Sequence, residues 1–295
     1  MDLGLLARLK RLAIIAMFSD DDLMDILVLK GGNLLDSIYA IAYRSSMDVD
    51  FSMEGEFGEG ELTTIAEKIR RTLTDTFKAE GFTAFDINFI VRPKKPLSPD
   101  VRDFWGGYRV EFKVVETEKY ERLHTDQRAL RMAAINLGKS NEKKFFIDIS
   151  KFEFCAPKRE VDLEEGYTIY VYTPEMLVFE KIRAICQQMS EYTAVVPNIG
   201  KSARARDFFD IYTVLQHWKV DIAAPENLEL LGNIFAAKRV PVELIQKIPE
   251  YRDFHRPDFS SVRDTVKADV ELQDFDFYFD YVVEKLAALK ALWEK

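Results

Sequence analysis

Two aspartates separated by one residue, Asp48 and Asp50, are the side chains in this sequence best suited to chemistry. They alternate with the apolar residues Met47, Val49 and Phe51, and this period of two predicts a β-strand. Residues two apart on a strand point to the same face, so the two carboxylates should lie side by side. Such carboxylates repel each other unless a cation lies between them, and oxygen ligands suit Mg²⁺ or Mn²⁺. The pattern therefore predicts a divalent-metal site.

A glycine pair lies upstream of the aspartates, directly after a short apolar run at 27–29 and one lysine. Gly31 and Gly32 allow a turn whose backbone amides can approach a phosphate chain closely. A phosphate-binding turn followed by a metal-binding carboxylate pair indicates an enzyme that uses a nucleoside triphosphate.

The composition indicates a globular protein, because 47% of the 295 residues are hydrophobic and 13% are aromatic. No apolar run approaches the roughly 18 residues that span a bilayer, and basic residues interrupt the N-terminal apolar segment, unlike a secretory signal. Cys155, Cys186 and three scattered histidines show no disulfide framework and no metal-ligand spacing. We therefore expect a reduced, cytoplasmic protein without a membrane segment. The net charge of −9 argues against a general nucleic-acid coat but permits RNA in a local basic groove.

The order of expected elements changes near residue 156. Before it, helices are expected over 3–17, 33–43 and 61–79, and strands over 27–29, 47–53, 85–91, 108–115 and 144–150. One more strand, over 167–172, precedes a part with helical patterns throughout. We therefore predict an α+β fold: a mixed sheet flanked by helices in a domain of residues 1–155, followed by a mostly α-helical domain of residues 156–295.

These features resemble the nucleotidyltransferase superfamily, in which a glycine turn, a helix and an Asp-x-Asp strand follow one another. More narrowly, the chain resembles the AbiEii/AbiGii toxin family of nucleotidyltransferases in four blocks that occur in the same order. The blocks are LKGGNLL at 29–35, RSSMDVDF at 44–51, the segment around Glu180-Lys181, and RARDFFDIY at 204–212. The resemblance implies a nucleotidyltransferase-like sheet, and a helical domain that contributes a lysine and an aspartate to the active-site cleft.

The resemblance also implies roles for the matching residues. Asp48 and Asp50 would hold the metal, and Asp207 would act as a base on the acceptor hydroxyl or orient the acceptor. Lys181 would neutralise the triphosphate and the pyrophosphate leaving group. These four are the expected catalytic residues. Besides Lys181, the expected nucleotide-binding residues are Lys30, Gly31, Gly32, Asn33, Arg44 and Ser46.

Two of these assignments have a structural alternative. Lys181 lies in a largely apolar helix, where it can instead pair with Glu175 or Glu180 at the rim. Asp207 lies in the first turn of a predicted helix, where the helix dipole alone favours an acid. Asp210, one turn further along, is expected to be structural.

A third metal-binding carboxylate is common in this superfamily. Asp148 is the first candidate, because an acid between two isoleucines on a central strand needs a partner or a metal. Glu111 is the second. The chain departs from the family at Asn33, where serine or threonine is usual. The amide can donate the same hydrogen bond to a phosphate, but the nucleotide preference stays open.

The implied function is metal-dependent transfer of a nucleotide from an NTP to an acceptor, with release of pyrophosphate. The family's toxins belong to toxin–antitoxin and phage-defence systems. A cognate antitoxin is therefore the implied partner, and RNA, such as a tRNA 3′ end, is the implied acceptor. The alternatives are transfer to a small-molecule or protein hydroxyl, and an inactive nucleotide-binding regulatory module. The oligomeric state is open.

Overall fold

The computed structural model describes residues 3–41, 48–95, 97–137, 141–163, 165–197, 199–267 and 270–293. The chain divides into two compact units. The first comprises Met1–Asn33, Met47–Leu97 and Gly106–Val171, and the second comprises Leu34–Ser46, Ser98–Trp105 and Tyr172–Lys295. Two short segments of the N-terminal half thus belong to the second unit. The domain boundary expected near residue 156 stays a prediction.

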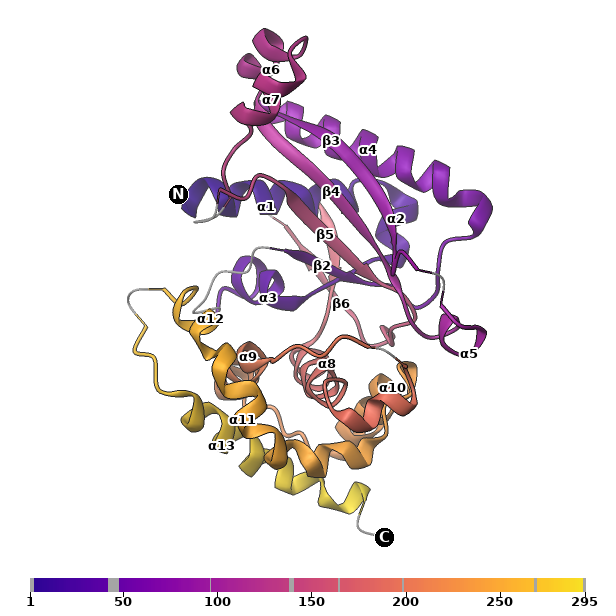
Figure 1. Ribbon diagram of the computed structural model, residues 1–295, viewed down its shortest axis with the longest axis vertical. Coiled ribbons are helices and arrows are strands. Elements are labelled where there is room, and N and C mark those ends of the chain that lie inside the picture. Colours follow the sequence, from indigo (N-terminus) through magenta and orange to yellow (C-terminus); the bar gives the residue numbers. More distant parts are fainter. Residues whose placement is uncertain are drawn as a thin grey trace. The chain divides into compact units, whose positions relative to one another are not determined.

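A mixed sheet forms the centre of the first unit, and seven of its strands lie in the described residues, in the order β3-β4-β5-β2-β1-β7-β6 (Figure 1). The pairs β2–β5 and β1–β7 are parallel, and the other neighbours are antiparallel. The strands are β1 Val28–Lys30, β2 Val49–Ser52, β3 Phe82–Arg92, β4 Gly107–Glu116, β5 Phe145–Ser150, β6 Arg159–Asp162 and β7 Thr168–Val171. The predicted α+β fold with a mixed sheet is confirmed.

The two faces of this sheet differ because polar and apolar residues alternate along its central strands. In β5, Phe145, Ile147 and Ile149 are buried, whereas Phe146 and Asp148 between them are partly exposed. The apolar residues form one face of the sheet. The alternate residues form the other, which we call the polar face.

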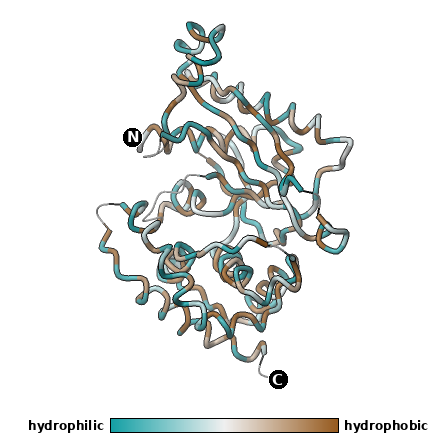
Figure 2. Tube along the Cα trace, in the orientation of Figure 1, coloured by the Kyte–Doolittle hydropathy of each residue, from teal (hydrophilic) through white to brown (hydrophobic). Residues whose placement is uncertain are grey.

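Two long helices, α1 (Leu3–Phe18) and α4 (Leu62–Ala79), pack on the apolar face (Figure 1). Phe18 of α1 meets Phe51 of β2, and Phe77 of α4 meets Phe112 of β4, each pair with ring centroids 5.6 Å apart. Hydrophobic residues recur along α4 at the spacing of one helical turn, so one side of the helix is buried (Figure 2). The polar face is therefore the side on which the sheet can present chemistry.

The strands β3 and β4 form a long ribbon, and two short helices, α6 (Thr117–Leu123) and α7 (Gln127–Ala133), follow it at one end (Figure 1). A bulge in β3 places Asp86 at a φ of 51°. Its carboxylate lies 2.7 Å from Lys113 of β4 and 2.8 Å from Arg131 of α7. The ion pairs of Asp86 therefore connect α7 to the ribbon. The sequence patterns did not predict these helices or β6.

The remaining helical elements of the first unit are α2 Asp21–Ile26, α3 Gly31–Asn33 and the 3₁₀ turn η2 Glu59–Glu61. Those of the second unit are the π-helix η1 Leu34–Ile38, α5 Pro99–Arg102, α8 Pro174–Cys186, η3 Ser190–Ala194, α9 Ala205–Trp218, α10 Pro225–Ala237, η4 Val242–Tyr251, α11 Arg252–His255, η5 Arg256–Asp258, α12 Phe259–Arg263, α13 Phe275–Leu286 and η6 Ala287–Leu292. The predicted helical character of the C-terminal part is confirmed. None of the helices in these described stretches has the length and apolar character to cross a membrane. Both cysteines are free and buried.

One predicted helix is wrong in extent. A helix was expected over 33–43, but the short α3 ends at Asn33 and is followed by the π-helix, which ends at Ile38. Ala40 has a φ of 54°, a left-handed conformation that an α-helix cannot contain. Residues 42 and 43 of the expected helix lie outside the described residues.

Candidate active site

The glycine turn lies directly against one carboxylate of the predicted metal pair. Gly31 follows β1 with a φ of 76°, a conformation that favours glycine. A Cβ atom at this position would overlap Oδ2 of Asp50. Gly31 is therefore needed twice, for the backbone turn and for the space that the carboxylate occupies. Gly32 is buried in α3, immediately after the turn.

Four charged residues lie opposite one another across four neighbouring strands of the polar face. Lys30 of β1 is opposite Asp50 of β2. Asp50 is opposite Asp148 of β5, and Asp148 is opposite Arg109 of β4. We call Lys30, Asp50, Asp148 and Arg109 the charged row. It places two acids at the centre with one base on each side, and Asp48 immediately precedes β2.

The strand register distinguishes the two candidates for a third carboxylate. Asp148 lies directly beside Asp50 on a parallel strand. Glu111 lies two residues beyond Arg109 on β4, opposite Phe146, and its carboxylate is 2.9 Å from Lys144. Asp148 is therefore the neighbour of the metal pair.

Asp148 is itself tied to Arg109 by two hydrogen bonds. Nε of Arg109 donates to Oδ1 and Nη2 donates to Oδ2, each over 2.7 Å. These bonds raise the pKa of the guanidinium; burial acts against the rise, and the negative charges of Asp148 and Asp48 add to it. Arg109 was not among the predicted site residues. The alternation of Arg109 with buried neighbours in β4 was the available signal, but its partner lies 39 residues away.

Two predicted phosphate-binding residues have partners within the protein. Lys30 donates to Oγ of Ser150 over 3.2 Å and lies 3.7 Å from Glu153, with its side chain buried. Asn33 is fully buried, and its amide donates to the main-chain oxygen of Asp48. The side-chain oxygen of Asn33, Oδ1, has no hydrogen-bond partner in the part of the chain that the structure describes. Asn33 thus links the glycine turn to the start of β2.

Two further predicted nucleotide-binding residues, Arg44 and Ser46, lie outside the described residues. Their assignment stays a prediction.

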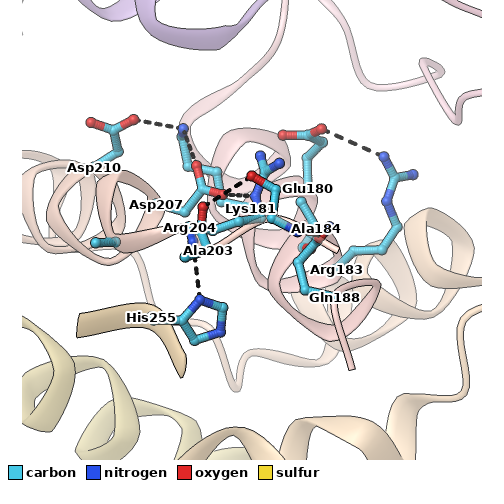
Figure 3. A network of polar contacts seen from close by, with 12 residues as sticks. Glu180, Lys181, Arg183, Ala184, Gln188, Ala203, Arg204, Asp207, Asp210 and His255 are labelled. Carbon is cyan, nitrogen blue, oxygen red and sulfur yellow. Dashed lines mark hydrogen bonds and ion pairs between the residues drawn. The ribbon is translucent and has the colours of Figure 1, made fainter. Parts of the chain in front are cut away.

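The predicted lysine and aspartate of the second unit are in direct contact. Nζ of Lys181, on α8, lies 3.2 Å from Oδ1 of Asp207 and 2.7 Å from Oδ2 of Asp210, both on α9 (Figure 3). Arg204 forms an ion pair with the other oxygen of Asp207. Lys181 and both aspartates have side chains less than a tenth exposed. The alternative partner Glu180 instead lies 3.6 Å from Arg183.

This ion-pair cluster decides what Asp207 can do chemically. Burial alone would raise the pKa of Asp207, but the charges and hydrogen bonds of Arg204 and Lys181 hold it well below its usual range. Both oxygens of Asp207 already accept hydrogen bonds from these cations, which disfavours a role as general base. Of the two roles expected for Asp207, orienting the acceptor fits this environment better than accepting its proton.

His255 completes the second-unit cluster and was not predicted. Its Nδ1 accepts a hydrogen bond of 3.0 Å from the backbone N–H of Arg204 (Figure 3). Its other nitrogen, Nε2, has no partner among the residues described. Burial lowers the pKa of His255 to about 4; the charge of Asp207 opposes this change and that of Arg204 adds to it. His255 is therefore neutral at physiological pH.

We expect His255 to make folding stability depend on pH between its ordinary pKa of 6.5 and its folded value of about 4. The unfolded chain binds the proton first as pH falls, so the free energy of unfolding should drop by about 2 kcal/mol from pH 7 to pH 5 through this group. Asparagine at this position keeps an acceptor for the Arg204 amide but does not titrate. His255→Asn should therefore show a flatter pH dependence than wild type in urea unfolding.

The exposed His124 offers the control, since His124→Asn should keep the wild-type slope. Equal slopes for wild type and His255→Asn would contradict the expectation.

The donor atoms of the first unit fit a magnesium ion that is shared with a substrate. Asp48 and Asp50 offer oxygen ligands, and the missing Cβ of Gly31 leaves space at the Asp50 carboxylate. Within the described ranges, no three His, Cys, Asp or Glu side chains are grouped to hold a metal. Mg²⁺ in nucleotide-dependent enzymes commonly uses only one or two carboxylates, with waters and substrate phosphates as its other ligands. The carboxylate pair is sufficient for that type of site.

Comparison with known proteins gives one family match. The sequence model of a family described as "Nucleotidyl transferase AbiEii toxin, Type IV TA system" matches residues 13–281. No curated protein matches the chain. Among solved structures, an antigenic nucleotidyltransferase-like protein from Paracoccidioides brasiliensis is similar, with 14% identity and a TM-score of 0.34 over 86% of this chain and 90% of that one.

Proposed function

Because this chain belongs to the family of AbiEii nucleotidyltransferase toxins of type IV toxin–antitoxin systems, we propose that it transfers a nucleoside monophosphate from an NTP to an acceptor hydroxyl. The observation that supports this most directly is the glycine turn packed against Asp50, next to Asp48. An acceptor oxygen attacks the α-phosphorus, its proton leaves, and the bond to pyrophosphate breaks. A bound divalent cation would supply charge neutralisation for the phosphates and the attacking oxygen.

Different residues would bind the cation, the phosphates and the acceptor. Asp48 and Asp50 would hold the cation, and the backbone amides of the turn at Gly31 and Gly32 would bind phosphate oxygens. In the second unit, Lys181 would contact phosphate oxygens and the leaving pyrophosphate, and Asp207 would orient the acceptor. Because Lys181 already neutralises two buried acids, a phosphate would have to share its charge with them.

RNA is the acceptor we propose, and a cognate antitoxin is the proposed partner. Both proposals follow from membership in a toxin–antitoxin family. Binding of an RNA acceptor should depend steeply on salt, because each RNA phosphate that the protein neutralises releases counterions. A small-molecule or protein acceptor need not show it.

The test is incubation of the full chain with Mg²⁺, total RNA and each of the four α-³²P-labelled NTPs, in parallel with Asp48→Asn. We expect label in one RNA class with the wild type and a loss on the order of 1000-fold or more in the variant, because the metal loses a charged ligand. Asp75→Asn on the exposed side of α4 is the matched control and should label RNA normally.

Label on the protein itself, or on a small molecule, would redirect the proposal to that acceptor. Undiminished labelling by Asp48→Asn would show that the metal pair is not the catalytic centre. Expression of the wild type or of Asp75→Asn should arrest growth, and expression of Asp48→Asn should not.

A further inference from the structure

Asp148 lies beside the proposed metal pair, but both of its oxygens are already bound. It lies beside Asp50 on a parallel strand, and both of its oxygens accept hydrogen bonds from Arg109. A guanidinium that binds both oxygens of a carboxylate forms a planar, fixed pair with strong, charge-assisted hydrogen bonds. To become a full ligand of a cation, Asp148 would have to weaken these bonds.

The protein holds Arg109 in this position from several sides. Arg109 lies directly opposite Asp148 in the antiparallel ladder. Its guanidinium lies over the ring of Phe146, 4.9 Å from the ring centroid. Both partners of the ion pair are only 30% exposed, so water screens the pair incompletely. Glu111, the next acid along β4, is bound to Lys144 instead. The pair is therefore prepared before any cation binds.

The charge balance of the polar face gives the pair a consequence for metal binding. Asp48, Asp50 and Asp148 would together present three negative charges. Arg109 cancels one of them, and Lys30, opposite Asp50, lies 3.7 Å from the carboxylate of Glu153. Three carboxylates would bind a divalent cation tightly in the absence of nucleotide and would leave fewer positions for phosphate oxygens. Two carboxylates bind it weakly until the triphosphate supplies the remaining ligands.

We propose that Arg109 is a positioning residue that keeps Asp148 out of the metal's ligand set, so that only Asp48 and Asp50 bind the cation. This inference rests on the proposed function in one respect, namely that the aspartate pair binds a divalent cation. Removal of Arg109 then releases a third carboxylate beside the pair, and the protein alone gains affinity for the cation.

Binding of Mn²⁺ to the full chain without nucleotide tests this, with free Mn²⁺ measured by electron paramagnetic resonance. We expect Arg109→Gln to tighten Mn²⁺ binding by about tenfold, because one more carboxylate becomes available. Arg109→Lys retains the charge but cannot bind both oxygens in the same planar pair, so its Mn²⁺ affinity should lie between those of wild type and Arg109→Gln. Asp148→Asn removes no ligand but leaves the charge of Arg109 unpaired near the cation, so it should bind Mn²⁺ more weakly than wild type. The double variant Arg109→Gln with Asp148→Asn should return to the wild-type value.

Thermal unfolding of each variant should accompany the titration, because a gain of affinity in a variant as stable as wild type cannot come from a damaged fold. Unchanged or weaker Mn²⁺ binding by Arg109→Gln, or a gain that persists in the double variant, would overturn the inference. Asp48→Asn distinguishes a failure of the inference about Arg109 from a failure of the proposed metal site. If Mn²⁺ binding in wild type and in Arg109→Gln is unaffected by that change, the proposed metal site itself is wrong.

Discussion

Replacing Gly31 with alanine should reduce nucleotidyl transfer by about 100-fold or more while the fold is retained, because a displacement of a reacting group by about 1 Å has effects of that size. The new Cβ would meet Oδ2 of Asp50, and that side chain would have to move. The positive φ adds a strain cost of about 1 kcal/mol, too small to unfold a domain of this size. Single-turnover transfer rates and thermal unfolding would measure the two effects separately.

Gly81 provides a matched control for this substitution. It has a φ of 82°, close to that of Gly31, but a Cβ there would meet no atom within 4 Å. Gly81→Ala should therefore lose similar stability and keep its transfer rate. Equal rates for the two alanine variants would show that the space beside Asp50 is not required for catalysis.

Replacing Lys181 with methionine should lower the free energy of unfolding by about 3 to 5 kcal/mol at pH 7, because two buried carboxylates lose their shared cation. Asp207 keeps Arg204 as a partner, whereas Asp210 loses the 2.7 Å contact with Lys181. Adding Asp210→Asn to the variant should restore part of the lost stability, since it removes one of the two buried negative charges that have lost the lysine. Urea unfolding at one pH measures all three proteins.

Lys290→Met, at an exposed position of the same unit, is the control and should change stability by less than about 0.5 kcal/mol. A Lys181→Met protein as stable as wild type would contradict the expectation. If such a protein were also inactive, the lysine would act on the substrate without holding the acids.

The fold class and the blocks of the site could be predicted because they depend on local patterns. A period of two put Asp50 and Asp148 on strands, with Asp48 directly before β2. Thr173-Pro174 marked the start of α8, where Thr173 accepts a hydrogen bond from the backbone N–H of Met176. The four sequence blocks are also local patterns, and the family match confirms the resemblance to the AbiEii family that they indicated.

The remaining features depend on pairings between distant segments. The choice between Asp148 and Glu111 required the register of β2, β5 and β4, which no single segment encodes. The role of Arg109 can be recognised only from that register, which places it opposite Asp148. The buried His255 bonds to a backbone amide 51 residues away, and one isolated histidine gives no periodic signal. The early end of the helix expected over 33–43 depends on the conformation of Ala40 rather than on its residue type.

The alternation of the sheet faces also constrains how this protein can change during evolution. In β5, the residues that hold the core and the residues that carry charge occupy successive positions, so a substitution can alter one property and leave the other. A single-residue insertion or deletion within the strand would change both properties at once. It would turn Asp148 towards α1 and α4 and bring Ile147 to the charged row. Length variation among homologues should therefore collect in α6, α7 and the loops, and the central strands should keep their lengths.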